Sequence, residues 1–260
     1  MILAREWDAG EYEKLSAPQT RWGVEVLERM DARGDEAAID AGCGTGRVTE
    51  LLLAKLPQGS VLAIDGSRAM VEAARRRFAG EPRVRVECQD LLSLEVEARV
   101  DLIFSTATFH WIWDHDRLFE NLARAIKPGG RLVAQCGGEG NISRATRAAK
   151  ETMQEERFLD YFVGWEDDKY YADARTTARR LEAAGFEEIE TWLHGEVAAF
   201  DSVDELARFL GTVVLGGHLE KLPEEERGPF AVGVAEKVVA VEGKPALDYV
   251  RLNMMARRSA

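Results

Sequence analysis

Short apolar runs alternate with amphipathic stretches along residues 37–136, and no other feature narrows the possible folds as much. The runs have the length of buried strands, and the stretches that separate them carry apolar residues mostly at helical spacing. The expected strands cover residues 37–41, 61–64, 84–88, 100–105 and 131–136. Strands and helices that alternate in this way indicate βαβ units, and hence a parallel sheet with helices on both faces.

The expected helices cover residues 45–56, a segment that Ser67 caps, and residues 115–126, where Pro128-Gly129-Gly130 should end the helix. Beyond this core we expect a helix over 177–184, a strand over 186–192 and a last strand over 246–256 that can pair antiparallel. Residues 144–171 and 201–241 do not follow the alternation of strands and helices, and we interpret them as helical additions over the strand ends. We therefore expect a single domain over 1–260, with a core over 34–143 and a helical insertion over 195–245 that serves as a lid or acceptor pocket.

The segment Asp40-Ala41-Gly42-Cys43-Gly44-Thr45-Gly46 follows the first expected strand and opens a helix. Parallel sheets bind ligands at the carboxyl ends of their strands, and glycines there let the backbone approach a ligand closely. The GxGxG spacing differs from the GxGxxG of dinucleotide folds, and the GxxxxGK[ST] of a P-loop is absent from the sequence. The pattern therefore points away from NAD and ATP.

Two further acids end the next two expected strands. Asp65 follows the second strand, where a carboxylate can bind both hydroxyls of a ribose. Asp90 follows the third strand and can accept a hydrogen bond from an exocyclic amine such as adenine N6. Leu91, Met70 and Gly66 could enclose the ring. Three consecutive strand ends thus present a glycine loop, a ribose acid and an amine acceptor.

The segments DAGCGTGRVT, AIDGSRAMVEAA, VECQDLLSL and IKPGGRLV resemble motifs of class I S-adenosylmethionine-dependent methyltransferases. The resemblance covers residues 37–136. It implies a Rossmann-like, mostly parallel sheet of about seven strands that ends in a reversed hairpin. It also implies S-adenosyl-L-methionine as the cofactor and S-adenosyl-L-homocysteine as the product.

The resemblance assigns roles to single residues. Asp40, Gly42, Gly44 and Gly46 would line the methionine moiety. Asp65 would hold the ribose, and Asp90 with Leu91 the adenine. The remaining residues expected at the cofactor lie in the same strand-end loops and are Cys43, Gly66, Ser67, Met70, Gln89 and Ser105.

A narrower resemblance is to the carboxyl methyltransferases of small molecules, in particular the trans-aconitate and juvenile hormone acid methyltransferase families. It is carried by Trp7, Tyr12, Gln19 and Arg21 and by the segment STATFHWI at 105–112. In the juvenile hormone enzymes a glutamine and a tryptophan are implicated in placing substrate or cofactor, and Gln19 and Trp111 match them here. Trp7 and Tyr12 could close over the cofactor as an N-terminal lid.

The sequence leaves several chemical classes open for the methyl acceptor. A carboxylate is already ionised at neutral pH and needs no general base. This suits a chain without an obvious catalytic dyad and favours O-methylation of a carboxylate. An amine, phenol or carbon acceptor would need a base, for which His110 is the best candidate. A non-catalytic cofactor-binding protein is a further alternative.

Charge, cysteine content and hydropathy limit the binding partners that the chain can have. The formal net charge is −12, which disfavours nucleic acid and anionic membrane surfaces. Three cysteines lie far apart without a CxxC pair, and the D-H-D sequence at 114–116 is interpreted as a helix cap rather than a metal site. No run of residues is long and apolar enough for a membrane span, and the N-terminus does not resemble a signal peptide. We expect a cytoplasmic protein that binds no metal, whose oligomeric state the sequence leaves open.

Overall fold

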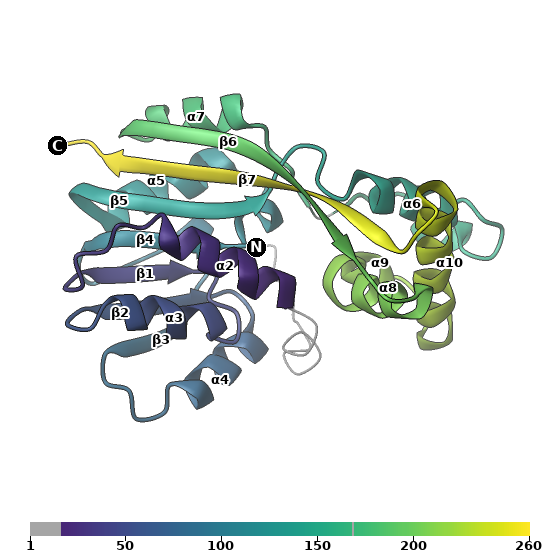
Figure 1. Ribbon diagram of the computed structural model, residues 1–260, viewed down its shortest axis with the longest axis horizontal. Helices are drawn as coiled ribbons and strands as arrows, with labels where there is room; N and C mark the ends of the chain where they lie inside the picture. Colours follow the sequence, from purple (N-terminus) through teal and green to yellow (C-terminus); the bar gives the residue numbers. More distant parts are fainter. Residues whose placement is uncertain (1–16, 168) are drawn as a thin grey trace.

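Seven strands form one open sheet in the order β3-β2-β1-β4-β5-β7-β6 (Figure 1). The structure, a computed structural model, describes residues 17–167 and 169–260, with side chains from residue 21. The strands are β1 Ala37–Ala41, β2 Ser60–Asp65, β3 Val84–Cys88, β4 Val100–Thr106, β5 Ile126–Gly137, β6 Phe186–Ala199 and β7 Ala246–Arg258. The first five run parallel, and β7 pairs antiparallel with both β5 and β6. This is the predicted Rossmann-like fold class, with the reversed hairpin at its end.

Helices cover both faces of the sheet. The α-helices are α2 Ala17–Glu28, α3 Arg47–Lys55, α4 Arg68–Arg77, α5 His115–Ala125, α6 Ser143–Met153, α7 Ala174–Ala183, α8 Val203–Phe209, α9 Gly216–Leu219 and α10 Glu224–Glu242. Shorter helical turns are η1 Leu91–Ser93, η2 Phe109–Trp111, η3 Leu159–Phe162 and η4 Leu210–Val214. Helices α2 and α3 pack on one face, while η1, α5 and α7 pack on the other. Side chains alternate along a strand, so β1, β2, β4 and β5 contribute residues to the hydrophobic cores on both faces of the sheet.

The prediction that Pro128-Gly129-Gly130 ends a helix is wrong. Helix α5 already ends at Ala125, and the tripeptide lies inside β5. There it forms a bulge, because Val100 pairs with Ile126 whereas Leu102 pairs with Arg131. Gly130 fits this bulge since a Cβ there would lie 2.9 Å from the Lys127 carbonyl oxygen.

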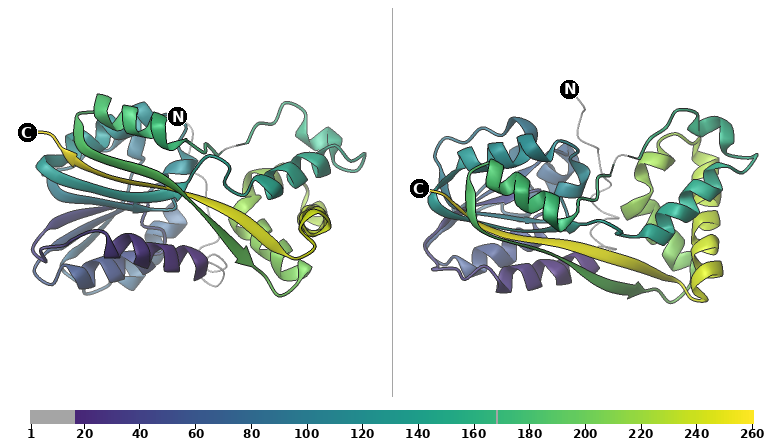
Figure 2. Two further views of the ribbon diagram at one scale, coloured as in Figure 1. Left: turned by 45° about the horizontal axis from the view of Figure 1, so that its top comes forward. Right: turned by 90° about the horizontal axis from the view of Figure 1, so that it is seen from above.

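The hairpin of β6 and β7 extends beyond the rest of the sheet. β5 pairs with β7 only as far as Arg251, whereas residues 246–250 of β7 pair with β6 alone. Figure 2 shows this two-stranded extension reaching from the sheet to a group of helices set apart from it. We call this group the helical cluster; it comprises α6, η3, α8, η4, α9 and α10.

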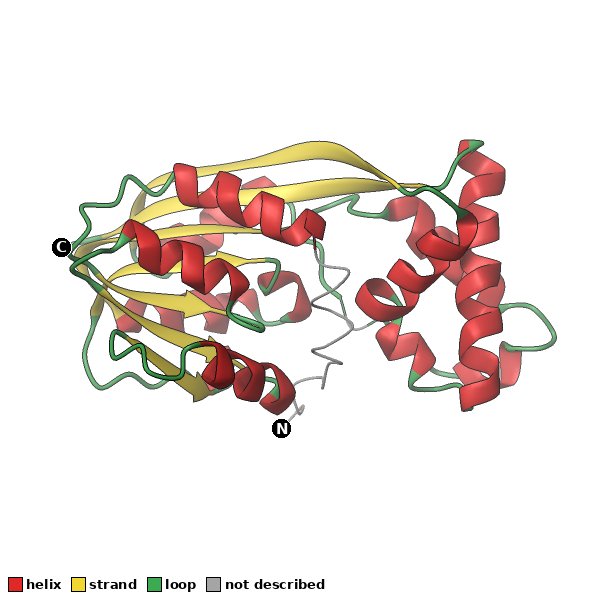
Figure 3. Ribbon diagram, turned by 60° about the horizontal axis from the view of Figure 1, so that its bottom comes forward, coloured by secondary structure: helices red, strands yellow, loops and turns green. Residues whose placement is uncertain are grey.

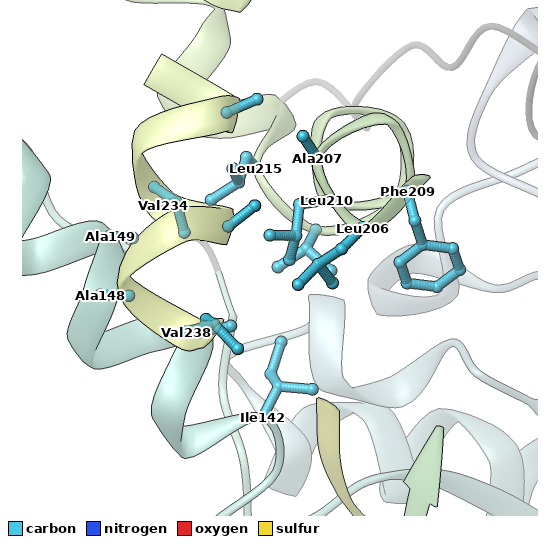
Figure 4. Close-up of a cluster of buried hydrophobic side chains, with 14 of the residues drawn as sticks. Ile142, Ala148, Ala149, Leu206, Ala207, Phe209, Leu210, Leu215, Val234 and Val238 are labelled. Atoms are coloured by element: carbon cyan, nitrogen blue, oxygen red, sulfur yellow. The ribbon is translucent and has the colours of Figure 1, made fainter. Parts of the chain in front are cut away.

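The helical cluster, which Figure 3 shows set apart from the sheet, has a hydrophobic core of its own (Figure 4). Leu206 of α8, Leu210 of η4 and Val234 of α10 are completely buried there, and Ala149 of α6 packs among them. The insertion expected over 195–245 thus differs at its start, because residues 195–199 belong to β6. Helix α6, from an earlier part of the chain, completes the cluster.

Candidate functional site

The glycine loop after β1 is held against the end of β2. The N–H groups of Gly42 and Cys43 both donate to the Ile64 carbonyl, over 2.8 and 2.9 Å. Gly42 has φ +86°, and a Cβ there would lie 2.0 Å from Thr108 Oγ1. A Cβ at Gly44, by contrast, would meet no atom of the described residues within 4 Å. The loop is therefore packed at Gly42 and open at Gly44, where a ligand can approach the backbone.

Asp65 joins the ends of β1 and β2. Its Oδ2 accepts a hydrogen bond from the Gly44 N–H and its Oδ1 accepts one from the Ser67 N–H, each over 2.9 Å. Ser67 in turn caps α4, since its Oγ accepts from the Met70 N–H. Because each carboxylate oxygen has two lone pairs, Asp65 can still accept hydrogen bonds from a ligand's hydroxyl groups. The structure thus brings Gly44, Asp65 and Ser67 together.

The residues after β3 lie beside this group, because the Gln89 N–H donates to the Asp65 carbonyl over 3.1 Å. Asp90 is exposed and caps η1 through the Leu92 N–H. Leu91 is buried. The side-chain amide of Gln89 is hydrogen-bonded both to the backbone N–H and to the carbonyl of Glu95, so it stabilises its own loop. Met70 is buried, and Gly66 stays partly exposed between β2 and α4.

Asp40 lies beneath the glycine loop, with 2% of its surface exposed. Thr49 donates a hydrogen bond to it over 2.6 Å. Burial raises the pKa of Asp40 to about 7, and the nearby charge of Asp65 adds to this effect. Burial also raises the pKa of the Cys43 thiol, so it is no thiolate nucleophile. Ser105, at the end of β4, donates to the Ala41 carbonyl over 2.6 Å and so joins β4 to the loop.

The acids around the loop suit the cationic cofactor that the resemblance implies. Asp40 and Asp65 lie near enough that the charge of Asp65 raises the pKa of Asp40. The charge of Asp65 attracts a positively charged ligand, and the opening at Gly44 gives such a ligand access to the backbone. The residues present therefore fit S-adenosylmethionine, which carries a sulfonium and an ammonium group.

His110 lies in η2, directly after β4. Its Nδ1 accepts a hydrogen bond from the Gly137 N–H over 3.3 Å, and its ring stacks on Tyr171 with centroids 5.8 Å apart. Burial, with the charges of Arg251 and Lys169, holds the pKa of His110 well below its usual range. A neutral imidazole that accepts at Nδ1 carries its proton on Nε2. The geometry thus favours His110 as a hydrogen-bond donor and disfavours it as a general base.

Trp111 is half-buried beside His110, with ring centroids 5.2 Å apart. Gln19 lies on α2, but its side chain is outside the described part of the structure. Trp7 and Tyr12 also fall outside the described residues. Arg21 forms an ion pair with Glu196 of β6, which ties α2 to the hairpin extension.

Three residues at the end of β5 were not predicted from the sequence. Tyr171 packs against Gly137, Lys169 lies over the Trp111 ring, and Arg251 of β7 is the cross-strand partner of Gly137. Arg251 did leave a signal, because it is a charged residue in a strand whose flanking residues are mostly apolar. Lys169 and Tyr171 lie in a charged, aromatic stretch without a regular period, which offers no comparable signal.

The D-H-D sequence has structural partners. Asp114 caps α5 through the Arg117 N–H over 2.9 Å, and Asp116 forms an ion pair with Arg180. His115 Nε2 is hydrogen-bonded to the Phe109 carbonyl over 2.9 Å. Within residues 17–167 and 169–260, no three His, Cys, Asp or Glu side chains are grouped so that they could hold a metal ion. Among the same residues, no helix has the length and hydropathy needed to cross a membrane.

Comparisons with known proteins agree with this site. A family model described as a methyltransferase domain matches residues 38–130. The chain is 30% identical to a trans-aconitate 2-methyltransferase from Methylobacterium nodulans, over 98% of this chain and 99% of that one. It is 35% identical to a second, from Methylobacterium radiotolerans, with the same two coverages.

Solved structures share the fold. Haemonchus contortus phosphoethanolamine N-methyltransferase 2, in complex with S-adenosyl-L-methionine, aligns with a TM-score of 0.64 and 19% identity, over 97% of this chain and 57% of that one. A structure described as a putative sarcosine dimethylglycine methyltransferase from Galdieria sulphuraria aligns with a TM-score of 0.60 and 15% identity, over 95% and 88%. At these identities the likeness shows the fold.

Proposed function

Because the chain belongs to the family of the trans-aconitate 2-methyltransferases, and so to the S-adenosylmethionine-dependent methyltransferases, we propose that it methylates a carboxylate oxygen of a small molecule. The full-length similarity supports an acid as acceptor, since the relatives are named for one. We further propose that it acts in the cytoplasm on free metabolites, not on nucleic acid or at a membrane. The net charge of −12 supports this choice.

The cofactor, when bound, supplies a methyl group already activated by a positive sulfur. Gly44 leaves its backbone accessible to this molecule, and Asp65 has lone pairs for the ribose hydroxyls. Asp90 and Leu91 lie at the next strand end, where we propose that they hold the adenine. The chain's task is then to align the acceptor with the methyl group and to keep water away.

The hydrogen bonding of His110 is the observation that supports a carboxylate as the acceptor. Its Nδ1 is engaged by the Gly137 N–H, so it can donate a proton from Nε2 in a hydrogen bond to an anionic oxygen. A carboxylate needs such a donor and no base. The rings of Trp111 and Tyr171 flank His110 and would shield this contact from water. We propose that Gln19 also contributes to placing the acceptor.

Methyl transfer from a labelled donor to a panel of acids, amines and phenols of similar size tests the proposal. We expect label in a product that mild alkali cleaves, as it does a methyl ester. At saturating donor, kcat/KM for the acid should be constant between about pH 6.5 and 9, because the carboxylate is ionised throughout.

Two results would contradict the proposal. An alkali-stable product, with a rate that rises through a single ionisation, would favour N- or C-methylation with His110 as base. Binding of S-adenosylhomocysteine without turnover of any acceptor in the panel would favour a cofactor-binding protein without catalysis. Calorimetry with S-adenosylhomocysteine shows in either case whether the cofactor site is intact.

A further inference from the structure

Strand β6 is the last strand of the sheet, and its outer edge pairs with no strand among the described residues. Such an edge presents N–H and C=O groups with which another chain can pair, and proteins commonly protect it with charges and bulges. The first part of β6 is protected in this way, by Glu187, Glu188 and Glu190 and by a bulge between the first and the last of these. Residues 191–199, which run into the hairpin extension of Figure 2, carry one acid, Glu196, and no bulge.

The hydrogen bonds of the hairpin show which residues of this stretch direct their backbone groups outward. Gly195 pairs with Val250 of β7. The Val250 carbonyl accepts from the Gly138 N–H and the Val250 N–H donates to Asn141 Oδ1, each over 2.9 Å, so both groups of Val250 point away from β6. Because bonded and non-bonded pairs alternate in an antiparallel ladder, the N–H and C=O groups of Gly195 and of the other odd-numbered residues in 191–199 lie on the free edge.

Gly195 lies at the centre of this stretch, and its own chain gives no reason for a glycine there. It is exposed, its φ lies outside the left-handed region, and a Cβ would meet no atom of the described residues within 4 Å. It does not lie at a bulge, since the pairing with β7 is continuous from Glu190 to Ala199. A glycine inside a strand weakens the strand, and without a bulge or bend it is typical of a place where another backbone approaches closely.

The side chains on the two sides of Gly195 are complementary to each other. If two copies of the chain pair antiparallel about a two-fold axis at Gly195, residue 193 of one lies opposite residue 197 of the other, and 194 lies opposite 196. Leu193, 39% exposed, then packs on Val197, which is 59% exposed. On the opposite face of the strand, the exposed His194 meets the carboxylate of Glu196. The symmetry forms each of these contacts twice.

We propose that residues 191–199 of β6 form a dimerisation edge, at which a second copy of this chain pairs antiparallel with the two-fold axis at Gly195. The sheets of the two copies would then form one continuous sheet. The free N–H and C=O groups meet only in registers that pair odd-numbered residues with each other. An axis at His194 also satisfies this condition, but it would place Leu193 opposite Gly195 and leave the apolar pair unformed. The inference goes beyond the proposed function and does not depend on which acceptor is methylated.

Analytical ultracentrifugation of the full chain between about 1 and 100 µM tests the dimer, and we expect a reversible monomer–dimer equilibrium in this range. Val197→Lys should raise the dissociation constant at least about tenfold, because it removes an apolar contact and adds a charge to the edge, both of them twice. Val241→Lys is the matched control, since Val241 is a valine of α10 that is also 59% exposed. It should change the constant by less than about threefold, and thermal denaturation checks that each variant is folded.

Variants at two further positions test the register. His194→Glu places a second carboxylate opposite Glu196 and should weaken the dimer, whereas His194→Lys should strengthen it. Gly195→Cys brings two thiols together at the axis, where the Cα atoms of a bonded pair lie about 5.5 Å apart, so mild oxidation should cross-link the dimer. Ala199→Cys is the control, because its partner is residue 191 and not a second cysteine. The wild type gives the background from the exposed Cys88.

A chain that stays monomeric over the whole concentration range would overturn the proposal. It is also wrong if the chain dimerises but Val197→Lys leaves the dissociation constant unchanged, because another surface then forms the contact. Equal effects of His194→Glu and His194→Lys, or equal cross-linking of Gly195→Cys and Ala199→Cys, would exclude the two-fold axis at Gly195. The assay of methyl transfer is separate from these measurements, so each of these results leaves the proposed function as it stands.

Discussion

The acids at the three strand ends have different surroundings, and these set what each can do. Asp40 is buried, and this burial suppresses its charge near neutral pH even though the hydrogen bond from Thr49 favours the charged form. Asp65 bonds to two backbone N–H groups. Asp90 is exposed and caps η1. Of the three, only Asp65 is oriented by backbone N–H groups of the glycine loop and of the turn before α4, which supports its assignment to the ribose.

Replacing Asp65 with alanine should weaken binding of S-adenosylhomocysteine by ~1–3 kcal/mol, because a charged acceptor for two hydroxyls is lost. Calorimetry measures the change directly. Glu50→Ala provides the control, since Glu50 is an exposed acid on α3 outside the loop. An unchanged dissociation constant for the Asp65 variant would remove the ribose assignment.

Replacing Asp40 with asparagine should change how stability depends on pH. The folded pKa of about 7 lies above the ordinary value of 3.8, so between these values the folded state holds a proton that the unfolded state has released. The contribution of Asp40 to the free energy of unfolding should therefore decrease as pH rises from 4 to 7, by at most about 4 kcal/mol.

The asparagine side chain in Asp40→Asn cannot ionise, but it can still accept a hydrogen bond from Thr49. The variant should gain stability relative to the wild type as pH rises from 5 to 8. Urea denaturation at each pH provides the measurement. Parallel curves for the two proteins would show that Asp40 ionises normally when folded.

At the scale of elements, the site depends on strand ends that meet at one edge of the sheet. The order of the sheet reverses between β1 and β4, and the glycine loop and η2 follow those two strands. Thr108 of the β4 end packs on Gly42 of the β1 end. The glycine loop and the turn that carries His110 are thus in direct contact, as expected at such a switch point.

Alanine substitutions at Gly42 and at Gly44 should have different effects. Gly42→Ala would combine a left-handed backbone with a Cβ 2.0 Å from Thr108 Oγ1, so we expect a loss of ~2–4 kcal/mol in the free energy of unfolding. Gly44→Ala places its Cβ more than 4 Å from every other atom in the described part of the chain, so the variant should lose only ~1 kcal/mol in the free energy of unfolding.

Cofactor affinity should distinguish the two variants further. The Gly44→Ala protein should fold yet bind S-adenosylhomocysteine at least tenfold more weakly, because the added methyl group occupies the space that a ligand would use. Thermal denaturation and calorimetry of both variants give the two quantities. Equal affinity of Gly44→Ala and wild type would place the cofactor away from Gly44.

At the scale of the whole molecule, two bodies with separate cores are joined mainly by the β6–β7 hairpin (Figures 1 and 2). Trp22 of α2 also belongs to the core of the helical cluster and packs on Tyr249, with ring centroids 4.6 Å apart. The end of β5, with His110, Tyr171 and Arg251, lies where the hairpin leaves the sheet. We propose that the helical cluster forms the roof of the acceptor site.

Leu206→Ala in the helical cluster should cost ~2–5 kcal/mol of local stability, since the side chain is fully buried. Hydrogen exchange should accelerate in α6, α8 and α10, while affinity for S-adenosylhomocysteine stays within about threefold of wild type. Leu102→Ala in β4 is the matched control, and it should lower both the stability of the sheet and the affinity for S-adenosylhomocysteine. Faster exchange throughout the sheet in the Leu206 variant would show that the two bodies unfold as one.

Local patterns in the sequence account for much of this protein. Strands β1 and β3 have the predicted bounds, and Ser67 caps α4 as predicted, because period, capping and burial act over a few neighbouring residues. The glycine loop and the acid of β2 could be placed side by side from the rule that parallel strands end at one edge.

The surroundings of His110 depend instead on contacts between distant parts of the chain. Gly137, Lys169 and Arg251 converge on it through strand pairing and loop packing, which no local period encodes. The same holds for the bulge at Pro128-Gly129-Gly130, where pairing with β4 turned an expected helix end into strand. Sequence therefore sufficed for most of the sheet and for its glycine loop, whereas the surroundings of His110 were decided by the tertiary structure, because long-range packing brings them together.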